Sequence, residues 1–93
     1  MRTIRTTRRF DRDFRRELSG VLGPKLDGLL RETVEMLAAD KPLPFRYADH
    51  ALSGKWADCR DCHIRPDLVL IYREPDEATL ELVRLGSHSE LRL

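Results

Sequence analysis

The stretch Leu68-Val-Leu-Ile-Tyr72 decides the fold of this 93-residue chain, because it is a continuous apolar run bounded by turn residues. Such a run is typical of a strand that is buried on both faces, so we expect it at the centre of a β-sheet. Turn-forming residues precede it at Arg65–Pro66 and follow it at Pro75–Asp76. Short connections of this kind join antiparallel neighbours. The flanking strands are therefore predicted at residues 56–64 and 79–85.

The N-terminal part of the chain is predicted to form one strand followed by two helices. Residues 2–7 are rich in β-branched side chains, which favours a strand. Phe10, Phe14 and Leu18 recur every four residues and predict an amphipathic helix with arginines on its outer face. A second helix follows a break and ends at residues 40–41, because Pro42 disfavours helical geometry just before it. Its apolar stripe consists of Leu26, Leu29, Leu30, Thr33, Val34 and Leu37.

The expected element order is β-α-α-β-β-β, with a short polar tail after Gly86. We expect an antiparallel pair of helices packed on one face of an antiparallel sheet, which is an α+β fold. A single domain over residues 1–93 accounts for the whole chain. Residues 41–55 have no consistent period and predict a long loop, a kind of segment that is often functional in compact domains.

Composition restricts the class of protein. The chain is 41% apolar and carries a net charge of +1, which is ordinary for a small globular domain. No apolar run approaches the roughly 20 residues that span a bilayer. The N-terminus lacks the apolar stretch of a secretion signal. We therefore expect a cytoplasmic protein with reduced cysteines and no contact with a membrane.

The even charge balance hides an asymmetry. Residues 1–16 hold seven arginines against two aspartates, a net +5, so the remainder of the chain carries −4. Arginine has a planar fork that binds phosphate or carboxylate through two hydrogen bonds. Two interpretations stay open: an arginine-rich helix face in solvent, or a surface for a polyanionic partner such as nucleic acid or an acidic protein segment.

The sequence Cys59-Arg-Asp-Cys62-His63 has the spacing of c-type haem attachment and also offers ligands for zinc. Side chains alternate along a strand, so Cys59 and Cys62 would point to opposite faces of the sheet and could not share one metal. Haem attachment also requires export and a mostly helical environment. We expect two ordinary half-buried thiols, no metal and no other cofactor.

The three histidines of the chain indicate a chemical site. His63 ends a strand just before a turn and Asp67 follows that turn, so the two side chains are expected close together. The next hairpin brings Arg84 and His88 to the same end of the sheet, while His50 lies in the long loop. Groups that titrate near neutrality can exchange protons while an arginine holds phosphate oxygens. These residues suit the cleavage of a phosphodiester.

Three ordered motifs carry a family resemblance. They are D-H-x-L-x-G-x-W at residues 49–56, R-D-x-H-[IV]-x-P-D at residues 60–67 and R-x-G-[ST]-H-S-x-L at residues 84–91. With Pro42-Leu-Pro44 upstream, they make the chain resemble the YafQ group of bacterial RelE-type toxins. The resemblance is sharp over the second half of the chain and looser over the two helices.

This resemblance implies a microbial-ribonuclease-like fold and the toxin of a type II toxin–antitoxin pair, an endoribonuclease that cuts mRNA on the ribosome. The RNA 2′-hydroxyl is expected to attack the adjacent phosphate without a metal, leaving a cyclic phosphate and a 5′-hydroxyl. In the implied active site His88 is the general acid and His50 or Asp67 the base. His63 orients or shares protons, and Arg84 stabilises the phosphorane.

The implied partners are mRNA on the 70S ribosome and a cognate antitoxin of the RelB or DinJ kind, encoded nearby. The arginine-rich first helix would contact ribosomal RNA or the antitoxin. Arg92 could stack on a base by its guanidinium plane. The other possible function is a non-catalytic one, either a ParE-like gyrase inhibitor or an inactive antitoxin-binding module, and the three histidines favour the nuclease. The residues expected to bind RNA are Lys55, Arg60, Arg65 and Arg92.

Overall fold

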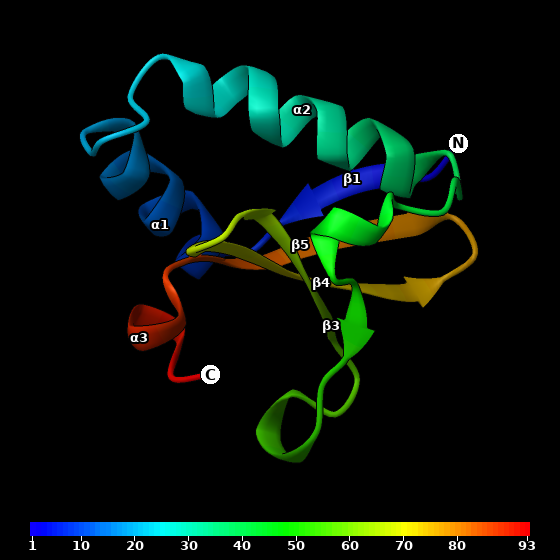
Figure 1. Ribbon diagram of the computed structural model, residues 1–93. Helices are drawn as coiled ribbons and strands as arrows, with labels where there is room; N and C mark the ends of the chain where they lie inside the picture. The colour runs from blue at the N-terminus through cyan, green and yellow to red at the C-terminus, as the bar shows by residue number, and fades with distance from the viewer.

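Five strands form one sheet across the molecule, as the computed structural model of all 93 residues shows (Figure 1). They are β1 (Thr3–Thr6), β2 (His50–Ala51), β3 (Arg60–Arg65), β4 (Leu68–Asp76) and β5 (Thr79–Gly86). Their spatial order is β1-β5-β4-β3-β2. The predicted central run lies in β4, which pairs antiparallel with β3 on one side and β5 on the other.

The sheet is mixed and not wholly antiparallel as predicted, because β1 pairs with β5 in the parallel direction. Thr3 is level with Thr79 and Thr6 is level with Leu82. Turn geometry fixes the direction of strands that a hairpin connects, whereas β1 and β5 are distant in the sequence and no turn sets their relative direction. The sequence therefore predicted that β1 exists but not which strand it joins.

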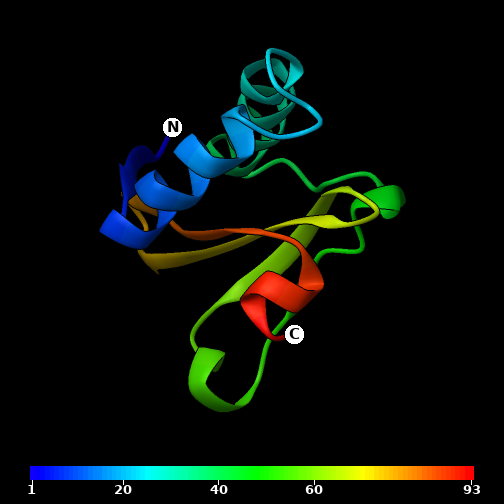
Figure 2. The same cartoon turned by 90° about the vertical axis from the view of Figure 1, so that its left-hand side faces the viewer.

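Helices α1 (Arg8–Leu18) and α2 (Lys25–Ala38) cover one face of the sheet (Figures 1 and 2). The chain reverses between them, and an apolar groove separates them, with Phe10 and Phe14 on one side and Leu30 and Val34 on the other. Thr7 caps α1: its Oγ1 accepts from the Phe10 amide at 3.0 Å and donates to the Val83 carbonyl at 2.7 Å. None of the helices is both long and apolar enough to span a membrane.

The long loop contains short elements that the sequence did not predict. Two single 3₁₀ turns, Phe45–Tyr47 and Gly54–Trp56, flank the two-residue strand β2. The strand predicted at residues 56–64 consequently begins only at Arg60. The polar tail folds into one helical turn, α3 (His88–Leu91), on the face of the sheet away from α1 and α2 (Figure 2).

Both faces of β4 are buried, which explains its unbroken apolar sequence. Leu70 and Tyr72 pack in the main core under the helices, while Val69 and Ile71 pack with Cys59 and Leu91 on the other face. The second, smaller cluster attaches α3 to the sheet. His63 is level with Val69, so the histidines lie beside this apolar cluster.

A bulge in β5 interrupts the predicted alternation. Tyr72 pairs with Leu82 and Ile71 pairs with Arg84, so Val83 is an extra residue without a partner on β4. Such a bulge shifts the facing of every later side chain in the strand. Because of it, Leu82 and Leu85 both join the core under the helices, and Arg84 is level with Ile71.

Candidate active site

His88 and Asp67 form the centre of the site. Asp67 lies in the exposed turn between β3 and β4, and its Oδ1 accepts from His88 Nδ1 at 2.9 Å and from the His88 amide at 3.1 Å. The hydrogen bonds from His88 lower the pKa of the Asp67 carboxyl. A capping box formed by Ser87 and Glu90 starts α3 and fixes the backbone at His88. The side chain of His88 therefore has a defined partner although it is half-exposed.

The ring of His63, on β3, contacts the ring of His88 on α3. The ring centroids are 4.9 Å apart and the rings meet edge to face. His63 is level with Val69 of β4, which is level with Gly86 of β5, so the strand order brings the two histidines together across the end of the sheet. The predicted convergence of His63, Asp67 and His88 is present in the structure.

His50 joins this group through Asp61, a residue that the sequence analysis did not select. His50 of β2 is level with Asp61 of β3, and its Nδ1 lies 3.0 Å from Asp61 Oδ1. The same nitrogen donates to the Ala48 carbonyl at 2.8 Å, so the buried Asp61 Oδ1 has no aligned hydrogen-bond donor. Strand alternation could have identified Asp61, since it lies two residues before His63 and hence on the same face.

Burial raises the pKa of the Asp61 carboxyl, and the nearby His50, His63 and His88 partly oppose that rise. All three histidines are thus close enough to act electrostatically on one buried acid. The site consists of three imidazoles and two carboxylates, of which Asp67 is exposed and Asp61 is 2% exposed. Carboxyl groups in such different surroundings titrate differently, as acid–base catalysis requires.

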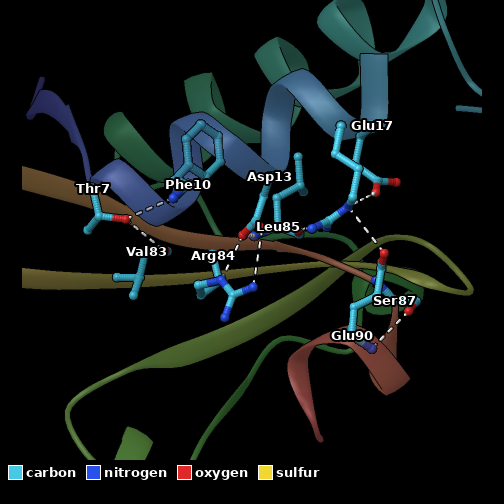
Figure 3. A network of polar contacts seen from close by, with 10 residues as sticks. Thr7, Phe10, Asp13, Glu17, Val83, Arg84, Leu85, Ser87 and Glu90 are labelled. Carbon is cyan, nitrogen blue, oxygen red and sulfur yellow. Dashed lines mark hydrogen bonds and ion pairs between the residues drawn. The ribbon is translucent and has the colours of Figure 1, made fainter. Parts of the chain in front are cut away.

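Arg84 lies beside this group and is held by α1. Its Nε donates to Asp13 Oδ2 at 2.7 Å and its Nη2 to Asp13 Oδ1 at 3.2 Å (Figure 3). The Leu85 amide and Arg16 donate to the same carboxylate, each at 3.0 Å. Burial alone would raise the pKa of Asp13, but these hydrogen bonds and the two guanidinium charges lower it. Arg84 is level with Ile71 and Asp61 across the sheet, and no hydrogen bond joins it to Asp67 or His88.

The four residues expected to bind RNA lie in different places. Arg65 ends β3 and lines an open pocket of 450 Å³ with His63 and Arg46, a cation that the sequence analysis missed. Lys55 lies over the Trp56 ring, on the 3₁₀ turn Gly54–Trp56. Arg92 comes directly after α3.

Arg60 lies on the other face of the sheet from the histidines. It is level with Tyr72 and belongs to the helix-covered face, where its Nε donates to Asp49 at 3.3 Å. Alternation along β3 turns Arg60 away when Asp61 faces the histidines. Arg60 is therefore not brought together with the histidine group, and its contact with RNA stays a prediction.

The two cysteines occupy opposite faces of the sheet, as alternation predicted. Cys59 packs with Val69, Ile71 and Leu91, and Cys62 packs in the core under the helices. Burial raises the pKa of the Cys59 thiol to about 11 and also raises that of Cys62. Both sulfurs are protonated thiols near neutrality, and no group of three or more His, Cys, Asp or Glu side chains is arranged to hold a metal ion.

Comparisons with known proteins agree with this geometry. The family described as "Bacterial toxin of type II toxin-antitoxin system, YafQ" matches residues 2–93. The chain is 46% identical over 50 residues to the mRNA interferase toxin YafQ of Escherichia coli K12, a match that covers 54% of this chain and 53% of that protein. The match thus spans about half the length of the curated relatives.

Solved structures match over nearly the full length. A metal-bound toxin from Helicobacter pylori is 45% identical with a TM-score of 0.81, and the match covers 98% of this chain and 99% of that one. YafQ in the DinJ–YafQ complex of Escherichia coli is 30% identical with a TM-score of 0.83, and the match covers 98% of both chains. The fold of the whole chain is therefore the fold of these toxins.

Proposed function

The chain belongs to the YafQ family of type II toxin–antitoxin toxins, and from that premise we propose that it is an endoribonuclease that cuts translated mRNA. The observation that carries the proposal is the contact of His88 with both Asp67 and His63. A pair of imidazoles beside a carboxylate can both remove and deliver a proton near neutral pH. RNA cleavage by its own 2′-hydroxyl requires both transfers.

The reaction conserves all atoms of the RNA. The 2′-hydroxyl oxygen attacks the adjacent phosphorus while a base takes its proton, and the bond from phosphorus to the 5′-oxygen breaks while an acid protonates that oxygen. The products are a 2′,3′-cyclic phosphate and a 5′-hydroxyl. Every step uses acid–base groups of the chain itself.

His88 suits the role of general acid. Asp67 accepts the Nδ1 proton of His88, which assigns the tautomer and leaves Nε2 as the atom that exchanges protons with the RNA. The carboxylate also stabilises the imidazolium that carries the transferable proton. Asp67 Oδ1 already accepts two hydrogen bonds from His88, so we assign Asp67 the role of orienting the general acid.

His50 suits the role of base. Its Nδ1 donates to the Ala48 carbonyl, which leaves Nε2 free to take up a proton, and the carboxylate of Asp61, 3.0 Å from Nδ1, can stabilise the positive charge that results. The His63 ring contacts the ring of His88, and the charge of His63 partly opposes the rise that burial causes in the pKa of Asp61. His63 is thus near both the proposed acid and the neighbour of the proposed base. His63 is therefore close enough to share in both proton transfers.

The open shape of the site supports dependence on the ribosome. The side chains of His50 and His88 are 55% and 40% exposed, so the chain does not enclose its substrate. An open site gains most from a partner that holds the RNA in line for attack, because orientation supplies much of the acceleration of such a reaction. We therefore include the translating ribosome in the proposed function, which locates the activity in the cytoplasm.

A protein antitoxin is the second proposed partner. The Escherichia coli relative is solved as a complex with DinJ, and this chain matches the YafQ chain of that complex over 98% of both lengths. An exposed set of catalytic histidines needs a covering partner when the toxin is not in use. We expect that partner to be a small DinJ-like or RelB-like protein encoded next to this chain.

Induction of the chain in a bacterial host, followed by primer extension on a translated message, tests the proposal. We expect new 5′-hydroxyl ends in the reading frame with the native chain and none with His88→Ala. Ser89→Ala is the matched control, because Ser89 is the next residue of α3, is exposed and makes no side-chain hydrogen bond. Growth arrest with intact message would instead indicate a target such as gyrase and would overturn the nuclease.

A further inference from the structure

Four arginines surround a polar cavity of 240 Å³ between α1 and β5, adjacent to the histidine group. Arg9, Arg12 and Arg16 form one stripe of α1, and Arg84 faces them from β5, with Asp13 between the two elements. No apolar side chain lines the cavity. Its lining therefore suits a charged group and not a nucleobase or an apolar side chain.

The acidic residues near this cavity neutralise only part of its charge. Asp13 is occupied by Arg84 and Arg16, and Arg16 also lies 3.1 Å from both Glu17 and Glu90. Arg9 and Arg12 form no ion pair with any carboxylate of the chain, and both are exposed. Two full positive charges thus remain at the rim.

The stability of α1 does not explain the charge of Arg9. Arg9 lies in the first turn of the helix, where the positive end of the helix dipole disfavours a cation. Asp11 in that turn and the cap by Thr7 are the features that favour the helix start. An arginine at this position therefore does not stabilise the start of the helix.

The guanidinium groups that line the cavity retain free donors. Arg84 uses Nε and Nη2 for Asp13, so both N–H bonds of Nη1 are unused. Asp13 fixes the orientation of that group, and Arg9 and Arg12 bring two more planar forks from the other side of the cavity. Several guanidinium groups around one cavity match the three or four oxygens of a phosphate better than they match a single carboxylate.

The cavity adjoins the histidine group through two connections. Arg84 is level with Asp61 across two strand spacings, which corresponds to about 10 Å. Arg16 contacts Glu90 of α3, the turn that carries His88. A strand of RNA that reaches His88 therefore passes the arginines within a short distance.

We propose that Arg9 and Arg12 bind an RNA backbone phosphate that flanks the phosphate being cleaved, next to Arg84, which Asp13 orients and which keeps its expected role at the cleaved phosphate itself. This inference rests on the proposed nuclease function and adds a second anchoring point for the strand. The phosphate belongs to the mRNA strand, and ribosomal RNA, which presents the same phosphodiester chemistry, is the alternative source that the test separates.

Removal of the two rim charges tests the proposal. The variant is Arg9→Gln with Arg12→Gln, and the control is Arg8→Gln with Arg15→Gln, which removes the same charge from exposed, unpaired arginines of α1 outside the cavity. One probe is a fully 2′-O-methylated RNA oligonucleotide, which lacks the attacking hydroxyl, and another is vacant 70S ribosomes. Binding of each probe is measured as a function of salt, with circular dichroism to verify folding.

We expect the slope of log affinity against log salt for the oligonucleotide to fall by about 0.7 to 1.4 in the cavity variant, corresponding to one or two lost phosphate contacts. The control variant should fall by less than half as much. A loss seen only with vacant ribosomes would assign the cavity to ribosomal RNA and would overturn a site that flanks the cleaved phosphate. Equal losses in the two variants, or none in either, overturn the proposal.

An acidic protein segment is the competing ligand, and poly-glutamate of matched length is its probe. Equal weakening of poly-glutamate and RNA binding by the cavity variant would refute a phosphate site. The primer-extension assay keeps the two proposals separate. Cleavage by the native chain with unchanged RNA binding in the cavity variant refutes only the phosphate site, and absence of cleavage by the native chain refutes the nuclease.

Discussion

Gly86 and Arg16 lie so close that a Cβ atom on residue 86 would be 2.9 Å from Arg16 Nη2 and 3.0 Å from Glu90 Oε1. Arg16 uses Nη2 to donate to the Leu85 carbonyl at 3.0 Å, and Glu90 completes the capping box of α3. The absence of a side chain at residue 86 lets α1 contact the turn that carries His88. Helix α1 is thus linked directly to the candidate general acid.

Gly86→Ala is expected to weaken both the Arg16 contacts and the start of α3. Arg16 and Glu90 can move aside because only the ends of their side chains are in the way, so the fold should survive with a loss of about 1 kcal/mol for the broken hydrogen bond. Cleavage should fall further than this loss of stability explains, because His88 is no longer held against Asp67. Thermal unfolding and cleavage rates measure the two effects, and unimpaired cleavage would contradict the linkage.

Gly28→Ala is expected to have the opposite effect on stability. Gly28 lies in the interior of α2, and a Cβ atom there would meet nothing within 4 Å. Alanine in place of glycine in an exposed helix interior stabilises by about 1 kcal/mol. We expect a higher midpoint of thermal unfolding with unchanged cleavage. A lower midpoint would show that α2 is not helical at this residue in solution.

Asp61→Asn is expected to raise stability near neutral pH while it lowers cleavage. Burial raises the folded-state pKa of Asp61, so its charged form is disfavoured in the folded protein. A carboxyl with a raised pKa stabilises the fold below its unfolded value and loses that contribution as the pH rises through its folded value. Removal of the charge should therefore add about 1 kcal/mol at pH 7, the order of the cost of a buried polar atom without a partner.

The advantage of Asp61→Asn should shrink as the pH is lowered, because the native carboxyl then becomes protonated. Unfolding midpoints of both chains at pH 7 and pH 5 measure this. A stability difference that grows on acidification would show that the Asp61 pKa is lowered in the fold and not raised.

Asp13→Asn is expected to destabilise the chain by about 2–3 kcal/mol, since two guanidinium groups lose their shared carboxylate while one remains largely buried. The hydrogen bonds and charges around Asp13 lower its pKa in the folded state. Its contribution is therefore complete above the unfolded value of about 4 and is lost as the pH falls through the folded value. Denaturant unfolding at pH 7 and pH 3 should show a difference from the native chain that is smaller at pH 3 than at pH 7.

Local patterns in the sequence predicted much of the fold. The apolar run at residues 68–72 identified the central strand because burial on both faces leaves no polar position, and the turns around it fixed the two hairpins. The same hairpins explain why His63, Asp67 and His88 could be placed together. These relationships involve neighbouring strands, whose geometry a short turn dictates.

The features that escaped prediction depend on contacts between distant parts of the chain. The parallel pairing of β1 with β5 and the contact of Asp13 with Arg84 join residues with no connecting turn to relate them. The bulge at Val83 has no glycine or proline to mark it, and it determines where Arg84 points. Asp61 differs from these, because the alternation that excluded a shared metal for Cys59 and Cys62 also places Asp61 beside His63.

The single turn α3 gives the candidate acid an unusual dependence on its surroundings. A helix of one turn has no stability of its own in water. It persists here because Leu91 is buried against Val69 and Ile71, and because Asp67 holds the His88 amide. We therefore expect a local opening equilibrium at the C-terminus, separate from global unfolding, to set the fraction of the chain in which His88 is held in place. Amide hydrogen exchange at His88 would report that equilibrium directly.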